Sequence, residues 1–303
     1  MHMNVLVLHT RPPHTVGHRR DVGEFDLLAA AHGVADALPH ADVVSVHGDA
    51  AEIIHTIASR QPDVVFNLCE APLGQPALEA HVAALLEWMG IRFTGSGSET
   101  LALCRRKDRT NAVLAAAGIR TPRTGVFPCL VKPNAEDGSA GIDGASICDD
   151  ARAVERATAR VSGPVVIEEF LPGREFAVTV WGRREPDHIS IGETRFLNGL
   201  RLITYAAKWD PDSADFANSP LEYDMTLESA LRDAMVAVSQ HVWRAVHARG
   251  YLRIDIRLNA LALPCVIDVN PNPELGPGVG ARRAVQEAGW SWTRFVQQQV
   301  EWA

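Results

Sequence analysis

Short apolar runs alternate with helical repeats over roughly the first 95 residues. Each run is bounded by polar residues, which is typical of strands buried on both faces of a parallel sheet. The predicted strands are 4–8, 42–46 and 63–68. Between them, apolar residues recur at helical spacing, which predicts helices at about 24–38, 50–60 and 76–89. This alternation predicts a small doubly wound α/β domain with a parallel sheet.

The pattern changes after about residue 98. A helix carrying residues 103–118 is predicted to end at Gly118, and short strands then surround a glycine-rich loop. The strands expected on either side of this loop are 129–133, 145–148 and 165–171, with a helix near 150–160. The remainder contains the stretches 175–182, 188–196 and 201–209, a long helix at 226–249, two further strands and a terminal helix. This second half of the chain is predicted to be α+β.

The two closing strands carry polar residues on one face. Alternation in 252–258 puts Arg253, Asp255 and Arg257 on the same side, and in 265–270 it does the same for Asp268 and Asn270. The six residues between the strands are few enough for an antiparallel hairpin. Two carboxylates and an amide oxygen on one wall are ligands suited to Mg²⁺. A solvated polar face with cross-strand Arg–Asp pairs is the other interpretation of these residues.

Two further stretches have the composition of nucleotide-binding segments. In 132–144, Lys132 ends an apolar strand and three glycines leave backbone N–H groups open to a phosphate, although the spacing matches neither the P-loop nor GxGxxG. In 165–176, an apolar strand runs into Glu168, Glu169 and a Pro-Gly turn, which suits an adenine and a ribose. An ordinary glycine turn and acidic residues at a strand end are the alternatives.

Composition narrows the class of protein. The net charge of −8 over 303 residues, without basic clusters, argues against nucleic acid or an anionic membrane as the main partner. The five cysteines are odd in number and widely spaced, which argues against a disulfide framework or a zinc site. No run of 18 apolar residues occurs. We therefore expect a soluble cytoplasmic protein.

The ordered set of these stretches, with Lys107 before them and Lys208 between, resembles the ATP-grasp superfamily and its D-alanine–D-alanine ligase branch. The resemblance extends from about Asp63 onward. It implies an ATP-dependent carboxylate–amine ligase with a three-domain ATP-grasp fold, ATP between the second and third domains, and a homo-oligomer. The implied domains are an N-terminal α/β domain at 1–95, a central domain at 96–170 and a C-terminal domain at 171–303.

The resemblance also implies roles for single residues. Lys107, Lys132 and Lys208 would hold phosphates of ATP, and Arg253 would join Lys132 and Lys208 in catalysis. Asp255, Asp268 and Asn270 would bind two Mg²⁺ ions, although the family usually has glutamate where this chain has Asp268. The other ATP contacts implied are Glu136, Gly138, Ser139 and Gly141 in the loop, Glu168, Glu169 and Leu171 at adenine, and Glu175 at ribose.

The substrate side departs from the D-alanine ligases. Their loop serine is replaced by Gly138, the tyrosine after the later lysine by Trp209, and a glycine near the end by Glu274. The early loop 9–25 lacks their glutamate motif, and its polar residues are candidates to bind charged ends of the substrate unless the loop is simply solvated. The substrate-side candidates are His14, Arg19, Glu24, Trp209, Asn272, Glu274 and Gly276.

These departures predict a different amino-acid substrate. The related enzyme that closes O-ureido-D-serine into D-cycloserine is similar in size and lineage, and it is the leading candidate. Its nucleophile would be an internal nitrogen, so a second amino-acid pocket would be unnecessary. A dipeptide ligase with an altered substrate is the alternative. A catalytically inactive nucleotide-binding protein is a third, although a pure binder has no need of the retained metal-binding residues.

Overall fold

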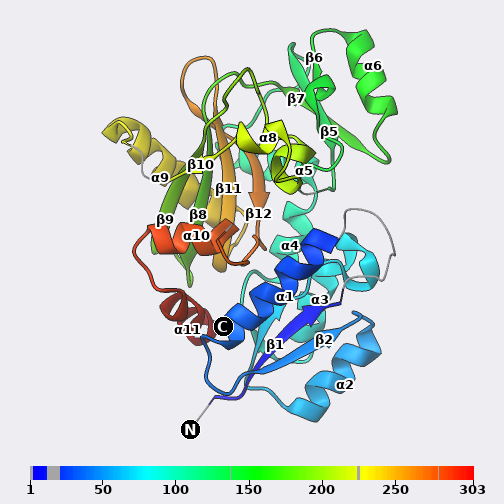
Figure 1. The fold of residues 1–303 in the computed structure, drawn as a ribbon, viewed down its shortest axis with the longest axis vertical. Coiled ribbons are helices and arrows are strands. Elements are labelled where there is room, and N and C mark those ends of the chain that lie inside the picture. Colours follow the sequence, from blue (N-terminus) through cyan, green and yellow to red (C-terminus); the bar gives the residue numbers. More distant parts are fainter. Residues whose placement is uncertain (1–2, 12–20, 137, 224–225, 279) are drawn as a thin grey trace.

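Three β-sheets follow one another along the chain in the computed structural model (Figure 1). The structure describes residues 3–11, 21–136, 138–223, 226–278 and 280–303, with only the backbone of 21–26. Each sheet falls within one of the ranges 1–95, 96–170 and 171–303, which we keep as proposed domain boundaries. Within the described residues, no helix combines the length and apolar character needed to cross a membrane.

The first sheet has the strand order β2-β1-β3-β4, and all its strands are parallel. Its strands are β1 (Val5–Thr10), β2 (Asp42–Val46), β3 (Val64–Leu68) and β4 (Arg92–Phe93). The intervening helices are α1 (Asp21–Ala35), α2 (Ala50–Arg60) and α3 (Glu79–Trp88), the last preceded by the 3₁₀ turns η1 (Pro72–Gly74) and η2 (Pro76–Leu78). The predicted doubly wound parallel sheet is therefore confirmed.

Alternation along β1 sends side chains to two different cores. Leu6 and Leu8 lie in the core that α2 and α3 cover, whereas Val5 and Val7 lie in the core on the α1 side. The second core is completed from the far end of the chain, because Phe295 of α11 (Trp292–Trp302) and residues of α10 (Gly280–Glu287) belong to it. Figure 1 shows α11 beside β1 and α1. The last helices thus bury one face of the first sheet.

The second sheet has the antiparallel order β6-β5-β7. Its elements are β5 (Cys129–Pro133), β6 (Ile147–Cys148), β7 (Val165–Glu169), the 3₁₀ turn η3 (Gly144–Ser146) and the helix α6 (Ala151–Ala159). All five cysteines of the chain are buried free thiols.

The helix predicted to carry residues 103–118 is divided after Cys104, which corrects that prediction. The chain forms α4 (Ser98–Cys104) and α5 (Lys107–Ala116) instead. The physical reason is a cap supplied from outside: Asn134, just after β5, accepts from the backbone N–H of Lys107 at 3.1 Å and, through its side chain, from that of Asp108 at 3.0 Å. Starting a new helix here places Lys107 beside the end of β5.

The third sheet has the order β10-β9-β8-β11-β12, in antiparallel pairs. Its strands are β8 (Glu175–Gly182), β9 (His188–Thr194), β10 (Leu221–Glu222), β11 (Gly250–Leu258) and β12 (Pro264–Asn270). Two short helices, α7 (Tyr205–Trp209) and α8 (Ala214–Ala217), precede β10, and the long helix α9 (Ser229–Ala245) precedes β11.

The two faces of the third sheet differ sharply in polarity. Val178 and Ile254 lie in an apolar core that α9 completes with Met235. On the opposite face, Trp181 and Tyr251 join the N-terminal core, where their rings lie 6.3 Å and 5.9 Å from that of Phe295. Farther along the same face of β11 come Arg253, Asp255 and Arg257. The sheet is therefore anchored at one end and presents charged side chains at the other.

Candidate active site

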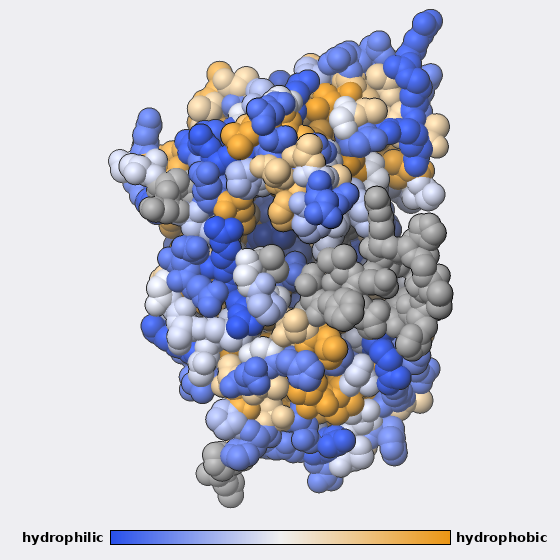
Figure 2. All heavy atoms as spheres, viewed as in Figure 1, coloured by the Kyte–Doolittle hydropathy of each residue, from blue (hydrophilic) through white to orange (hydrophobic). Residues whose placement is uncertain are grey.

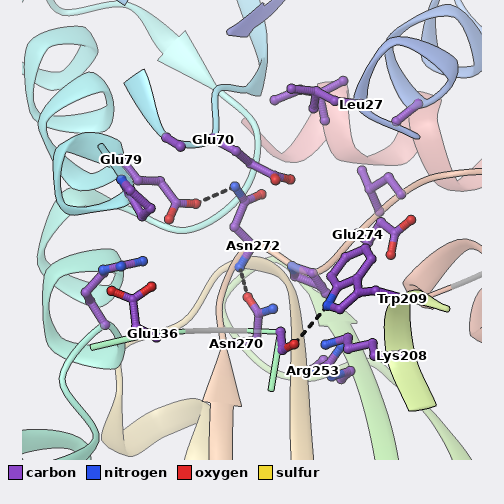
Figure 3. A pocket seen from close by; sticks show the side chains of 18 of the residues that line it. Leu27, Glu70, Glu79, Glu136, Lys208, Trp209, Arg253, Asn270, Asn272 and Glu274 are labelled. Atoms are coloured by element: carbon purple, nitrogen blue, oxygen red, sulfur yellow. Dashed lines mark hydrogen bonds between the residues drawn. The ribbon is translucent and has the colours of Figure 1, made fainter. Parts of the chain in front are cut away.

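A cavity of about 390 Å³ lies between the N-terminal domain and the polar face of the third sheet. Figure 2 shows a hollow at mid-height with hydrophilic residues around it, and Figure 3 shows the lining side chains. Elements from all three proposed domains contribute to its wall. The polar side of the lining includes Glu70, Glu79, Arg105, Glu136, Tyr205, Lys208, Trp209, Arg253, Asn270, Asn272 and Glu274.

The register of β11 and β12 brings the predicted metal-binding residues together. Asp255 lies directly opposite Asp268, and Arg253 lies directly opposite Asn270. The pairing shifts by one residue after Asp255, so the arrangement ends there. The predicted antiparallel hairpin with its polar residues on one wall is confirmed. Their roles as metal ligands remain a proposal.

Cations surround the two carboxylates. Arg253 donates to Asp255 through Nε and Nη2, at 2.8 Å and 2.9 Å, and Nζ of Lys107 lies 3.4 Å from Oδ1 of Asp268. Burial works against the charged form of Asp268, but Lys107, Lys132, Arg253 and Lys208 together hold its pKa below the ordinary value. Asp268 therefore stays ionised, and it is a competent ligand for a divalent cation.

The two buried lysines converge on β12. Lys132 forms an ion pair of 2.6 Å with Glu168 and also donates to the backbone carbonyl of Ile267 at 2.9 Å. Lys107 donates to the carbonyl of Glu136 at 2.9 Å, in addition to its contact with Asp268. Buried ammonium groups require such partners. Lys107 and Lys132 thus bring two cations from the proposed central domain to the edge strand β12 of the third sheet.

Neighbouring residues at the end of β7 point in opposite directions, as strand geometry requires. Glu168 is 3% exposed and accepts from the side chain of Asn111 at 2.6 Å, besides pairing with Lys132. Glu169 instead forms a two-pronged pair with Arg123, at 2.7 Å and 2.8 Å. Leu171 is buried beyond the strand. The structure thus brings Glu168, but not Glu169, to the lysine cluster.

Glu175 lies in a buried ion pair. Its Oε2 is 3.0 Å from Nη1 of Arg257, which also donates to the carbonyl of Arg201 at 2.6 Å. Burial raises the pKa of Glu175 despite the charge of Arg257 beside it. Arg257 therefore has a partner of its own within the sheet and is separated from the Arg253–Asp255 pair.

Trp209 forms a hydrogen bond with the glycine loop. The indole Nε1 donates to the carbonyl oxygen of Gly138 at 2.8 Å, as Figure 3 shows. Gly138 has a φ of +67°, and a Cβ added there would lie 3.1 Å to 3.4 Å from atoms of the indole. Gly138 and Trp209, two of the positions expected to differ from the D-alanine ligases, are therefore in direct contact. Ser139 and Gly141, also with positive φ, complete this part of the loop, and Lys208 lies 5.7 Å from the indole centroid.

The turn after β12 is tied to the N-terminal domain. The backbone N–H of Asn272 donates to Oδ1 of Asn270 at 2.9 Å, and its side chain donates to Glu79 at 2.5 Å. Glu274 lines the cavity and Gly276 is buried in the turn. His14 and Arg19 lie outside the described residues, and so does the side chain of Glu24.

Several lining residues were missed by the reasoning from sequence, among them Glu70, Glu79, Arg105 and Tyr205. A signal existed for Glu70, because it follows β3 and ligands bind outside the carboxyl ends of parallel strands. Thr10, at the end of the adjacent β1, accepts from the backbone N–H of Glu70 at 3.1 Å and donates to its carbonyl oxygen. This contact fixes Glu70 at the rim.

The donor set fits a divalent cation bound partly by water and phosphate. Asp255, Asp268 and Asn270 supply hard oxygen donors, which Mg²⁺ prefers. Among the described residues, no cluster of three or more His, Cys, Asp or Glu has the geometry of a metal site. A cation held here would complete its shell with oxygens from ATP and solvent.

This chain is similar in sequence to proteins of a known family. The family model described as the D-ala D-ala ligase C-terminus matches residues 103–301. The chain belongs to this family. A D-alanine–D-alanine ligase of Gluconobacter oxydans is 32% identical over 248 residues, which are 77% of this chain and 78% of that one. The ligase of Cereibacter sphaeroides is 28% identical over 294 residues, or 90% of each chain.

Solved D-alanine–D-alanine ligases have the same fold. The Bacillus anthracis enzyme complexed with ATP superposes with a TM-score of 0.74 and 18% identity, covering 99% of this chain and 96% of that one. The predicted ATP-grasp fold is thus confirmed. Membership of the D-ala D-ala ligase family makes the protein an ATP-dependent ligase that forms C–N bonds.

Proposed function

We propose that the protein activates the carboxylate of a small amino acid as an acyl-phosphate and closes it onto a nitrogen of the same molecule. The leading candidate reaction converts O-ureido-D-serine into D-cycloserine. The observation that supports this chemistry is the register of β11 and β12. It pairs Asp255 with Asp268 next to the pair of Arg253 and Asn270, and the latter pair lines the cavity. An inactive nucleotide binder has no need of two paired carboxylates with cations around them.

The proposed roles follow from position and charge. Lys107 and Lys132 would bind phosphate oxygens of ATP, and Lys208 would meet the transferring phosphoryl group from the opposite wall. Arg253 would leave Asp255 to steady the acyl-phosphate, since a guanidinium matches phosphate oxygens well. Mg²⁺, held by Asp255, Asp268 and Asn270, would offset the negative charge on the phosphates. The protein's main contributions are orientation and charge stabilisation.

The adenosine half of ATP would lie along the central domain. Glu168, Glu169 and Leu171 supply the strand end proposed for adenine, and Glu175 is proposed for ribose. Glu136, Gly138, Ser139 and Gly141 would cover the phosphates, with Trp209 fixing the loop through its bond to Gly138. Glu274, Asn272, Trp209 and Gly276 are proposed on the substrate side, with His14, Arg19 and Glu24 from the early loop.

The reaction balances as three steps, the last of which consumes one water molecule. The substrate carboxylate takes the γ-phosphoryl group of ATP, giving the acyl-phosphate and ADP. The ureido nitrogen bonded to oxygen then attacks the carbonyl carbon, and phosphate leaves as the ring closes. Hydrolysis of the carbamoyl group left on that nitrogen releases carbon dioxide and ammonia. The contact between Gly138 and Trp209 supports an altered substrate, because it remodels the side of the cavity nearest Lys208.

A dipeptide ligase with an altered amino acid is the second candidate, and the relatives named D-alanine–D-alanine ligase support it. Phosphate release with ATP, Mg²⁺ and either O-ureido-D-serine or paired D-amino acids, followed by mass spectrometry of the product, separates the two. A cyclic product from the single substrate supports the cyclase. A dipeptide as the sole product favours the second candidate, and no substrate-dependent release of phosphate contradicts both.

A further inference from the structure

A hydrogen bond joins the N-terminal domain to the turn that follows β12. Glu79 begins α3, and its Oε1 accepts from Nδ2 of Asn272 at 2.5 Å although the two residues are 193 positions apart. Hydrogen bonds to an ionised acceptor are short and are stronger than neutral ones. Figure 3 shows this bond at the wall of the cavity, above Asn270.

A second hydrogen bond connects the backbone of Asn272 to Asn270, the proposed metal ligand. The N–H of Asn272 donates to Oδ1 of Asn270 at 2.9 Å. An amide oxygen has two lone pairs, so this contact orients the Asn270 side chain and leaves one lone pair for a cation. Because Asn270 lies opposite Arg253 in the sheet, its orientation also sets the geometry beside the reacting centre.

The prolines on either side of Asn272 do not fix the turn by themselves. Pro271 and Pro273 each lock their own φ, but neither restricts the side chain of Asn272. The anchor on Glu79 supplies the missing restraint. It comes from a helix that packs on the first sheet, whose core is separate from that of β11 and β12.

We infer that Glu79 is a positioning residue: through Asn272, it fixes the turn after β12 so that Asn270, at the end of that strand, keeps its metal-binding orientation. This inference rests on the proposed function, because it assigns Asn270 to a divalent cation. It gives the N-terminal domain a part in the chemistry beyond forming one side of the cavity.

Hydrogen exchange of the ligand-free protein tests the positioning role directly. In Glu79→Ala, the exchange rate of the Asn272 amide should rise by about tenfold, the equivalent of one charge-assisted hydrogen bond. In Glu79→Gln, whose amide oxygen can still accept from Asn272, the rate should stay within about threefold of wild type. The control Glu87→Ala removes another carboxylate of α3, which accepts from Ser98 at 3.0 Å, and should leave residues 270–275 unchanged.

Kinetics give the second readout. Glu79→Ala should raise the Mg²⁺ concentration needed for half-maximal phosphate release, leave KM for the amino acid within about twofold, and be rescued by Glu79→Gln. Unchanged exchange at Asn272 in the alanine variant would overturn the inference. So would a rise in KM for the amino acid alone, which would make Glu79 a substrate contact. If wild type releases no phosphate, the proposed function fails, and the exchange comparison still decides the role of Glu79.

Discussion

Asp255 and Asp268 lie directly opposite each other on neighbouring antiparallel strands. Like charges in this position repel, so the pair requires nearby cations. Arg253 supplies one through its two bonds to Asp255, and Lys107 supplies another 3.4 Å from Asp268. The arrangement places two carboxylates opposite each other with a cation beside each. This is the condition for binding a divalent cation beside a phosphate.

Replacing Asp268 by alanine should remove turnover while sparing much of the ATP binding. Phosphate release should fall by at least about 100-fold, because charge stabilisation of the transferring group is lost. Lys132 and Glu168 remain to hold the nucleotide, so the Kd for ATP should change by less than about tenfold. Isothermal titration and a phosphate assay measure the two effects. Asp149→Ala, at an exposed position of the central domain, is the control. Turnover that survives in Asp268→Ala would show the metal assignment to be wrong.

The contact between Gly138 and Trp209 predicts that substitutions of these two residues have non-additive effects on KM for ATP. Gly138→Ala should raise KM for ATP by about three- to tenfold, because alanine is strained at positive φ and crowds the indole. Trp209→Ala should also raise KM, through loss of the bond to the loop carbonyl. In the double variant the crowding disappears. The change in the free energy of ATP binding should therefore be smaller than the sum of the changes in the two single variants. Additive effects in a double-mutant cycle would contradict the contact.

Arg257→Ala should destabilise the protein more at pH 8 than at pH 5. The variant leaves Glu175 buried without its cation, and a pKa already raised by burial should rise further. A raised folded-state pKa contributes stability at low pH that is lost as pH rises through it. The expected loss at pH 8 is about 3–5 kcal/mol, measured by urea unfolding. Glu175→Gln, which removes the titrating group, should abolish the extra pH dependence when combined with Arg257→Ala.

Glu193 should give stability the opposite dependence on pH. It is buried and accepts from Arg174 at 2.8 Å and 2.6 Å, which is the main reason that its pKa lies below the ordinary 4.5. A lowered folded-state pKa contributes stability above about pH 4.5 that is lost as pH falls through the folded value. Glu193→Gln should therefore cost about 1–3 kcal/mol at pH 7 and progressively less toward pH 4. A cost that does not change over this range would contradict the assignment.

The hairpin of β11 and β12 illustrates what the sequence is sufficient to predict. Period-2 alternation and a six-residue connection determine which side chains share a face, and they predicted that Asp255 and Asp268 would meet. The parallel first sheet was likewise visible as short apolar runs. These features depend on residues close together in the chain, so they can be predicted from the local sequence pattern.

Contacts between distant segments were not predictable in the same way. The division between α4 and α5 depends on Asn134, which caps α5 from the end of β5, and no Gly or Pro marks it. The bonds of Glu79 to Asn272 and of Trp209 to Gly138 likewise join segments far apart in the chain. Such pairs depend on how three sheets pack together, and a single sequence contains no direct sign of that packing.

The packing of α11 on the first sheet limits how the protein can be synthesised and recombined. Val5 and Val7 emerge early from the ribosome, but their core partner Phe295 is translated only after all three sheets. Helix α1 covers part of this apolar face early, but the part that α10 and α11 bury stays exposed to other chains and to chaperones until the last helices are made. An exchange of N-terminal domains between related ligases would, for the same reason, need to include residues 280–302 from the same parent.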